Sequence, residues 1–170
     1  IMTDTGGNPF AAQTRGGQLP ITLYVRAFEK GGLDYRAAIE RVAGEFNAIL
    51  GEPVFTVVTT GLTSGVETVY VDGLPQDNYG VAEWTSDWYP RLGLIEYRTV
   101  YSAPTVDVLE VVTRHEMGHV LGLNHSNDWA HLMVGGVAPQ VDHFSNDEIA
   151  VMRCRYHLPR GWDSTRYEQQ

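Results

Sequence analysis

Eleven consecutive residues, from His115 to His125, combine three imidazoles and a carboxylate at spacings that could hold and use a metal ion. They read His-Glu-x-x-His-x-x-Gly-x-x-His. A helix turns by about 100° per residue, so His115 and His119 lie roughly 40° apart on one face and can bind the same ion. Glu116 lies about 60° round from His119, which is too far for an obvious third ligand. Its carboxylate can instead reach a water molecule on that ion.

Gly122 and His125 complete the pattern. Gly122 predicts the end of the helix, because glycine adopts the left-handed conformation at low cost. The chain can then turn back and bring His125 to the same ion from another direction. Three neutral histidines and one open position are typical of a catalytic zinc site, in which Glu116 can take a proton from the zinc-bound water. Histidines that merely fill a core would need neither the glycine nor the third spacing.

Three helices are predicted around this motif. Asp107 should cap the helix that carries the first two histidines, beginning near Val108. Asp34 should cap an earlier helix, and Gly51 should end it. The apolar residues of that earlier helix repeat at helical spacing: Ala38, Ile39, Val42, Phe46 and Ile49. Ser145 and Glu148 have the spacing of a capping box at the start of a last helix, which presents Ile149, Met152 and Tyr156 on one face.

Five segments have the composition of strands: 21–25, 54–59, 66–71, 80–85 and 94–101. The predicted order is strand, helix, four strands, metal-site helix, loop and last helix. This order indicates an α/β (α+β) arrangement of a sheet and helices.

The extended motif resembles that of the metzincin zinc metalloproteases, in which a methionine turn follows the third histidine. Met133 is the matching methionine, and the resemblance implies that it packs under the zinc without binding it. Within the metzincins the chain is most similar to the matrixin branch. The pairs His125-Ser126 and Leu132-Met133 and the segment 144–149 carry this similarity.

The resemblance implies a zinc-dependent endopeptidase that hydrolyses extended polypeptides, with Glu116 as the general base. It implies a twisted, mainly parallel five-stranded sheet, two helices above a zinc cleft and a small C-terminal subdomain with one helix. The edge strand would bind substrate through the backbone of Ala82 and Glu83. The turn at Met133 and the loop 134–140 would wall the next pocket, with Val134, Gly135 and Gly136 as candidate substrate contacts.

Several matrixin features are missing from the sequence. No proline follows two residues after Met133, and the single cysteine, Cys154, lies in the last predicted helix rather than in a cysteine switch. Segments 80–85 and 93–98 lack the histidines and aspartates that hold a second, structural zinc in animal matrixins. We therefore predict one zinc ion; calcium is conceivable, but no feature of the sequence supports it.

Length and composition set the remaining expectations. A chain of 170 residues predicts a single catalytic domain over 20–160, with an upper part at 20–122 and a lower part at 123–160. Residues 1–19 should be extended, and 161–170 should form a tail. The net charge of −9 argues against nucleic acid, and no apolar run reaches membrane-spanning length. We expect a monomer, and the family resemblance implies secretion, although no signal peptide is visible.

Alternatives remain open at this point. The same fold could serve as a latent or non-catalytic zinc-binding interaction module, although retention of Glu116 favours an enzyme. Asp4 could silence the zinc, or the N-terminal ammonium could pair with Asp147; one N-terminus cannot do both. His131, His143 and His157 are predicted to be surface or loop residues rather than zinc ligands.

Overall fold

A computed structural model describes residues 20–25, 29–30, 32–60, 66–70, 79–84, 97–103, 105–121, 123–135 and 141–157. The chain divides into two compact units at Glu116 and Met117. One unit, residues 19–116, contains the sheet, and the other includes residues 117–170. The predicted domain limits stay a prediction, and segments 1–19 and 161–170 lie outside the described residues.

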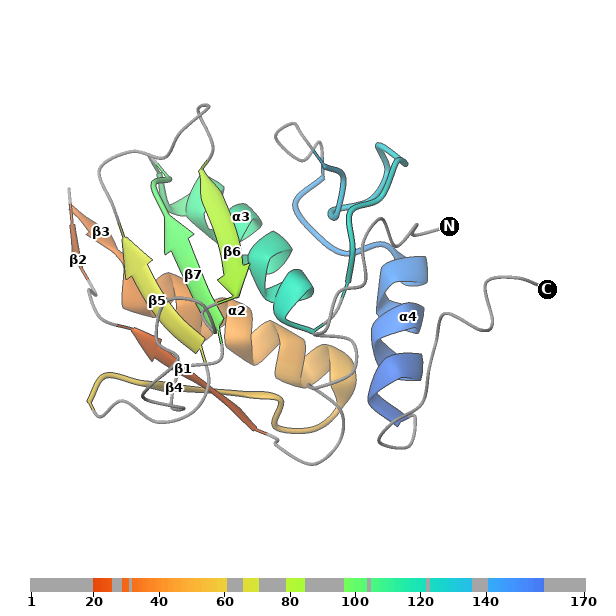
Figure 1. The fold of residues 1–170 in the computed structure, drawn as a ribbon, viewed down its shortest axis with the longest axis horizontal. Coiled ribbons are helices and arrows are strands. Elements are labelled where there is room, and N and C mark those ends of the chain that lie inside the picture. Colours follow the sequence, from red (N-terminus) through yellow and green to blue (C-terminus); the bar gives the residue numbers. More distant parts are fainter. Residues whose placement is uncertain are drawn as a thin grey trace. The chain divides into compact units, whose positions relative to one another are not determined.

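A five-stranded sheet forms the framework of the unit 19–116 (Figure 1). Its strands are β1 (Ile21–Val25), β4 (Phe55–Val58), β5 (Val66–Tyr70), β6 (Gly80–Trp84) and β7 (Tyr97–Tyr101). They lie in the order β4-β1-β5-β7-β6, and all neighbours are parallel except β6, which runs antiparallel to β7. The mixed α/β class with a mainly parallel sheet is therefore confirmed.

The edge strand β6 has a defined register against β7. Ala82 pairs with Thr99, and Glu83 pairs with Arg98. Because β6 comes last in the sheet order, its other edge has no strand neighbour in the part of the chain that the structure describes. The predicted substrate strand is thus a terminal strand of the sheet.

Helix α2 (Tyr35–Leu50) begins and ends at the predicted residues. The Asp34 carboxylate accepts the Ala37 N–H at 2.9 Å, and Gly51 has a φ of 77°, in the left-handed region. The predicted apolar residues are buried except Ile49, which is partly exposed, while Leu50 is buried instead. The core of this unit includes the edge-to-face contact of Phe46 with Phe55, whose ring centroids lie 5.4 Å apart.

Strand β4 is one residue shorter than predicted at each end, although the Val54 carbonyl still accepts the Ile21 N–H of β1 at 2.7 Å. The Asn47 side chain accepts the N–H groups of Val54 and Phe55 and donates to the Phe55 carbonyl. A side chain of α2 thus satisfies backbone groups at the start of β4, in addition to the pairing of that strand with β1. The structure also adds a short antiparallel hairpin that was not predicted, formed by β2 (Glu29–Lys30) and β3 (Leu33–Asp34).

Helix α3 (Val106–Val120) carries the histidine motif and starts before the predicted position. The prediction that Asp107 caps it was wrong: the Thr105 hydroxyl accepts the Val108 N–H at 3.3 Å, and the Thr105 carbonyl accepts the Leu109 N–H at 2.9 Å. Asp107 lies two residues after Thr105, in the first turn of α3, where its negative charge is favourable at the positive end of the helix.

Ion pairs connect α3 to α2 within the unit 19–116. The Arg114 guanidinium donates to both oxygens of Glu45, at 2.7 and 2.8 Å, and Arg41 donates to Glu110 at 2.7 Å. These ion pairs lie on the more exposed side of α3, while Leu109, Val112 and Thr113 of the same helix are buried. The turn of α3 before His115 is therefore fixed by both packing and charge.

The C-terminal unit contains the end of α3, the turn segment 123–135 and helix α4 (Asn146–His157). Ser145 and Glu148 form the predicted capping box: the Glu148 carboxylate accepts the Ser145 N–H at 2.8 Å, and the Ser145 hydroxyl accepts the Glu148 N–H at 3.2 Å. No helix in the described ranges is long and apolar enough to cross a membrane.

Candidate metal and catalytic site

The three predicted ligands come together. One ring nitrogen from each of His115, His119 and His125 lies within 4.8 Å of the others. His115 and His119 are one turn apart on α3, and His125 follows the end of that helix. A metal ion is usually held by at least three histidine, cysteine or carboxylate side chains. Among the described residues, these three histidines form the group that is close enough to do so.

The spacing between two of the imidazoles fits zinc. The Nε2 atoms of His119 and His125 lie 3.2 Å apart, with their rings at 74° to each other. Two nitrogens bound to one tetrahedral zinc at its usual bond length lie about 3.3 Å apart. The donor set of three imidazoles is also one that zinc accepts readily, so the residues present fit this ion.

A backbone carbonyl fixes the tautomer of His119. Its Nδ1 lies 2.8 Å from the Leu123 carbonyl oxygen, which can only accept, so Nδ1 carries the hydrogen and donates it. The lone pair is then on Nε2, the nitrogen that faces His125. This is the usual arrangement around a metal-binding histidine, whose second nitrogen is held by an outer partner.

The helix ends so that the chain can turn toward His125. The Leu121 N–H bonds to the Met117 carbonyl at 3.0 Å, and the Leu123 N–H bonds to the Gly118 carbonyl at 2.9 Å. The second bond, across five residues, is the long hydrogen bond of a Schellman motif at the end of the helix. Gly122 itself lies outside the described residues.

Met133 is fully buried, and α3 leaves space for it at a glycine. A Cβ atom on Gly118 would lie 2.6 Å from the Met133 sulfur. Gly118 immediately precedes His119, so Met133 packs against the backbone beside a ligand. The motif allows any residue at this position, so the sequence pattern did not indicate that a small residue is needed there.

A second glycine packs against the third ligand. A Cβ atom on Gly135 would lie 2.8–3.1 Å from His125 ring atoms and its Cβ. The strand-like pairing of Ser126 with Val134, and the bond from the Ser126 N–H to the Met133 carbonyl at 2.7 Å, bring Gly135 to this position. Of the predicted pocket residues, Val134 is buried, and Gly136 lies outside the described residues.

Glu116 is buried beside the ligands, at 6% exposure, and His115 is buried to a similar degree. Burial lowers the pKa of His125 below its usual 6.5, because loss of hydration disfavours the charged imidazolium. The metal-free site therefore favours the neutral imidazole, which is the form that binds a metal.

The remaining histidines and predicted contacts take other places. His131 is half-buried in the turn and bonded to Ser126, and His143 is exposed beside Asp142. The backbone of Ala82 and Glu83 lies in β6, while their side chains, that of His157 and all of Asp4 fall outside the description. Asp147 is exposed in the first turn of α4.

Comparisons with known proteins give one family match and a structural match. Residues 76–157 match the model of the peptidase family described as matrixin. The crystal structure of archaemetzincin from Methanopyrus kandleri matches with a TM-score of 0.51 and 14% identity, over 79% of this chain and 94% of that one. A comparison with curated proteins gave no match. Together the family match and the shared fold support a metallopeptidase domain of the metzincin type.

Proposed function

We propose that this chain, with its metzincin-type domain, is a zinc-dependent endopeptidase that hydrolyses peptide bonds in extended polypeptides. The observation that carries the proposal is the group of three imidazoles within 4.8 Å, with Glu116 next to the first of them on α3. Three protein ligands leave a coordination position for chemistry, whereas a structural zinc usually has four.

One zinc ion would be held by His115, His119 and His125. When bound, zinc lowers the pKa of water and polarises a carbonyl group. Leu123 keeps His119 in the tautomer whose Nε2 can bind, and the lowered pKa of His125 keeps its ring neutral. These two features favour binding-competent rings at His119 and His125 before an ion binds.

Glu116 acts as the general base and then as the general acid. Its carboxylate takes a proton from the attacking water and passes it to the leaving amine. Its burial keeps the carboxylate within the site rather than in bulk water. Its place directly after His115 keeps it on the metal-binding part of the helix.

The polypeptide substrate would bind as an added strand along β6. The backbone groups of Ala82 and Glu83 provide the hydrogen bonds, in a mode of recognition that depends on main-chain geometry. The terminal position of β6 in the sheet supports this role. Val134, Gly135 and Gly136, after Met133, would wall the pocket for the next substrate side chain.

The decisive experiment compares four proteins, the native chain and three variants, on a mixed peptide library, each with and without a zinc chelator. The native chain should cleave peptides and lose activity with the chelator. Glu116→Ala should bind one zinc but lose about 10²- to 10⁴-fold in kcat/KM, since it lacks the general base. His125→Ala should lose zinc affinity, whereas His143→Ala, an exposed histidine outside the group, should lose neither property.

Two results would contradict the proposal. Cleavage that persists in Glu116→Ala would exclude the mechanism. Stoichiometric zinc binding without cleavage by the native chain would indicate the alternative, a latent or non-catalytic zinc-binding module.

A further inference from the structure

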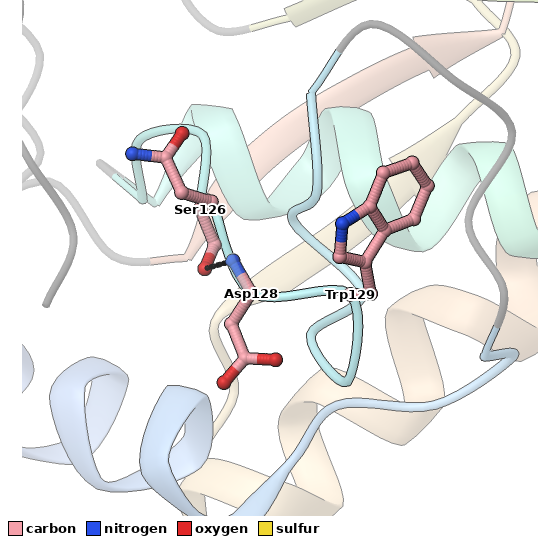
Figure 2. A pocket seen from close by; sticks show the side chains of 4 residues that line it. Ser126, Asp128 and Trp129 are labelled. Atoms are coloured by element: carbon pink, nitrogen blue, oxygen red, sulfur yellow. Dashed lines mark hydrogen bonds between the residues drawn. The ribbon is translucent and has the colours of Figure 1, made fainter.

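The turn that follows the third histidine is held by hydrogen bonds rather than by packing. Its middle residues, 127–130, are all exposed, so they bury little apolar surface. Ser126, at the start of the turn, is 3% exposed. Its hydroxyl accepts the Asp128 N–H at 3.0 Å, as Figure 2 shows, and lies 2.7 Å from Nδ1 of His131. A buried serine thus closes a turn whose other residues face the solvent.

The Ser126 hydroxyl donates to His131. Its oxygen already accepts the Asp128 N–H, and its single hydrogen is buried and needs an acceptor. Among the described residues, Nδ1 of His131 is the partner that can provide one. His131 therefore carries its ring hydrogen on Nε2. A side chain that places another acceptor near the position of Nδ1 should be able to replace it.

The same serine joins the two ends of the turn. The Ser126 N–H donates to the Met133 carbonyl at 2.7 Å, and Ser126 pairs with Val134 in an isolated bridge. The bond between Ser126 and His131 adds a side-chain link between the same two segments. These three contacts converge on one residue, so the two segments have a fixed relative position.

This relative position determines where the His125 imidazole lies, because the ring packs against Gly135. A Cβ atom on Gly135 would lie 2.8 Å from Cγ and 2.9 Å from Nδ1 of that ring. His125 is an exposed residue, and its Nε2 lies 3.2 Å from Nε2 of His119, near the spacing that suits one zinc ion. A metal site needs its ligands within about 0.5 Å of the productive geometry. Movement of Gly135 relative to His125 would therefore weaken the site.

We propose that Ser126 and His131 are positioning residues for the metal. Their side-chain hydrogen bond fixes the turn so that Gly135 holds the His125 imidazole in place to bind zinc. Neither residue belongs to the three-histidine group: Ser126 is buried, and Nδ1 of His131 takes the hydroxyl hydrogen. The inference rests on the zinc binding in the proposed function and extends the site to side chains that support a ligand.

The test measures the dissociation constant for zinc in folded, metal-free variants, by competition with a chelator of known affinity. Ser126→Ala and His131→Leu both remove the side-chain bond and should each raise this constant by about tenfold, as for other outer contacts of metal sites. The double variant should lose no more than either single one, because both substitutions remove the same interaction. His131→Asn keeps an oxygen near the position of Nδ1 and should restore most of the affinity.

His143→Leu is the matched control. His143 is an exposed histidine that pairs with Asp142 in the same C-terminal unit and lies outside the three-histidine group, so its replacement should leave zinc affinity unchanged. Gly135→Ala displaces the ring directly and should weaken zinc binding at least as much as Ser126→Ala. Cobalt(II) gives a second readout, because its visible spectrum depends on ligand geometry. The spectrum of cobalt-loaded Ser126→Ala should differ from that of the native chain.

A purely structural role would give a different result. If Ser126→Ala lowered the free energy of unfolding but left zinc affinity and the cobalt spectrum unchanged, the bond would stabilise the turn without positioning the ligand. A double variant with the sum of both single losses would also contradict the proposal. So would a His131→Asn variant that binds zinc no better than His131→Leu.

A measurement without metal separates this inference from the proposed function. In the metal-free native chain, NMR should show a nuclear Overhauser effect between the His125 ring and the Hα protons of Gly135, and Ser126→Ala should weaken it. If the native chain binds zinc but cleaves nothing, the endopeptidase function fails and the positioning role stands on the zinc affinities. If cleavage occurs while Ser126→Ala changes neither the Overhauser effect nor zinc affinity, the positioning role fails alone.

Discussion

At the scale of residues, Glu148 links the methionine turn to the start of α4. Its buried carboxylate accepts the N–H groups of Leu132 and Met133, at 3.3 and 2.8 Å, and the N–H and hydroxyl of Ser145, at 2.8 and 2.9 Å. The sequence predicted the contacts with Ser145. The sequence did not predict the hydrogen bonds from the Leu132 and Met133 N–H groups to the same carboxylate. These bonds hold Met133 in its place against Gly118.

The substitution Glu148→Gln tests this double role. Glutamine has the same size, but its amide NH₂ would face hydrogen-bond donors, so the free energy of unfolding should fall by about 1–3 kcal/mol. Urea denaturation measures the loss. Glu40→Gln, which affects an exposed pair with Arg36 on α2, should cost less than about 0.5 kcal/mol. Equal effects of the two substitutions would argue against a special role for Glu148.

At the scale of elements, β6 approaches α3 closely at Gly80. A Cβ atom there would overlap Cγ1 of Val112 and lie 3.0 Å from Oε1 of Glu116. The start of the proposed substrate strand therefore packs directly on the part of α3 that carries the proposed base. The hydrogen bond from the Ser102 N–H to the Tyr79 carbonyl, at 2.9 Å, continues the contact between the chain segments of β6 and β7.

We expect Gly80→Ala to separate β6 from α3. The added methyl should lower the free energy of unfolding by about 1–3 kcal/mol, as for other overpacked cores. Displacement of Glu116 should also lower kcat/KM, by up to about a hundredfold. Gly44→Ala is the matched control: it lies in α2 with open space around its Cβ and should stabilise the protein by about 0.5–1 kcal/mol. If Gly80→Ala and Gly44→Ala had similar effects on stability and on kcat/KM, β6 would not lie as close to α3 at Gly80 as we describe.

At the scale of the whole molecule, acid should weaken both the metal-free fold and its affinity for zinc. Burial lowers the pKa of His125 in the folded chain below the unfolded value of 6.5. Well above pH 6.5 His125 is neutral in both the folded and the unfolded state, so its burial has no protonation cost. As the pH falls from there through the lowered pKa, the unfolded chain binds a proton more readily, and stability is lost.

A titration of the imidazole signals by NMR in metal-free protein checks this sign, with His125→Gln assigning the His125 resonance. The titration midpoint of His125 should lie below pH 6.5. The urea concentration at the midpoint of unfolding should decrease as the pH is lowered through this range. Zinc affinity should also fall in acid, because protons compete with the metal for the histidines. A midpoint for His125 above 6.5 would contradict the effect of burial.

Much of the site could be predicted because its ligands are close in sequence. His115 and His119 share a helix face by spacing alone, and His125 is near enough for one turn to return it. The helix limits at Asp34, Gly51 and Ser145 were predicted for the same reason, since each depends on hydrogen bonds within a few residues. Local spacing decides such features before the chain is packed.

Only the tertiary structure decided which small residues and which turn the site requires. Gly118 and Gly135 are needed because Met133 and the His125 ring approach them, and no periodic pattern reports such contacts. The start of α3 directly after Thr105 depended on which nearby side-chain oxygen accepts the first helix N–H groups, and this was the Thr105 hydroxyl. The sequence by itself therefore predicted the group of three histidines and the position of the proposed base, whereas packing between distant segments determined what supports them.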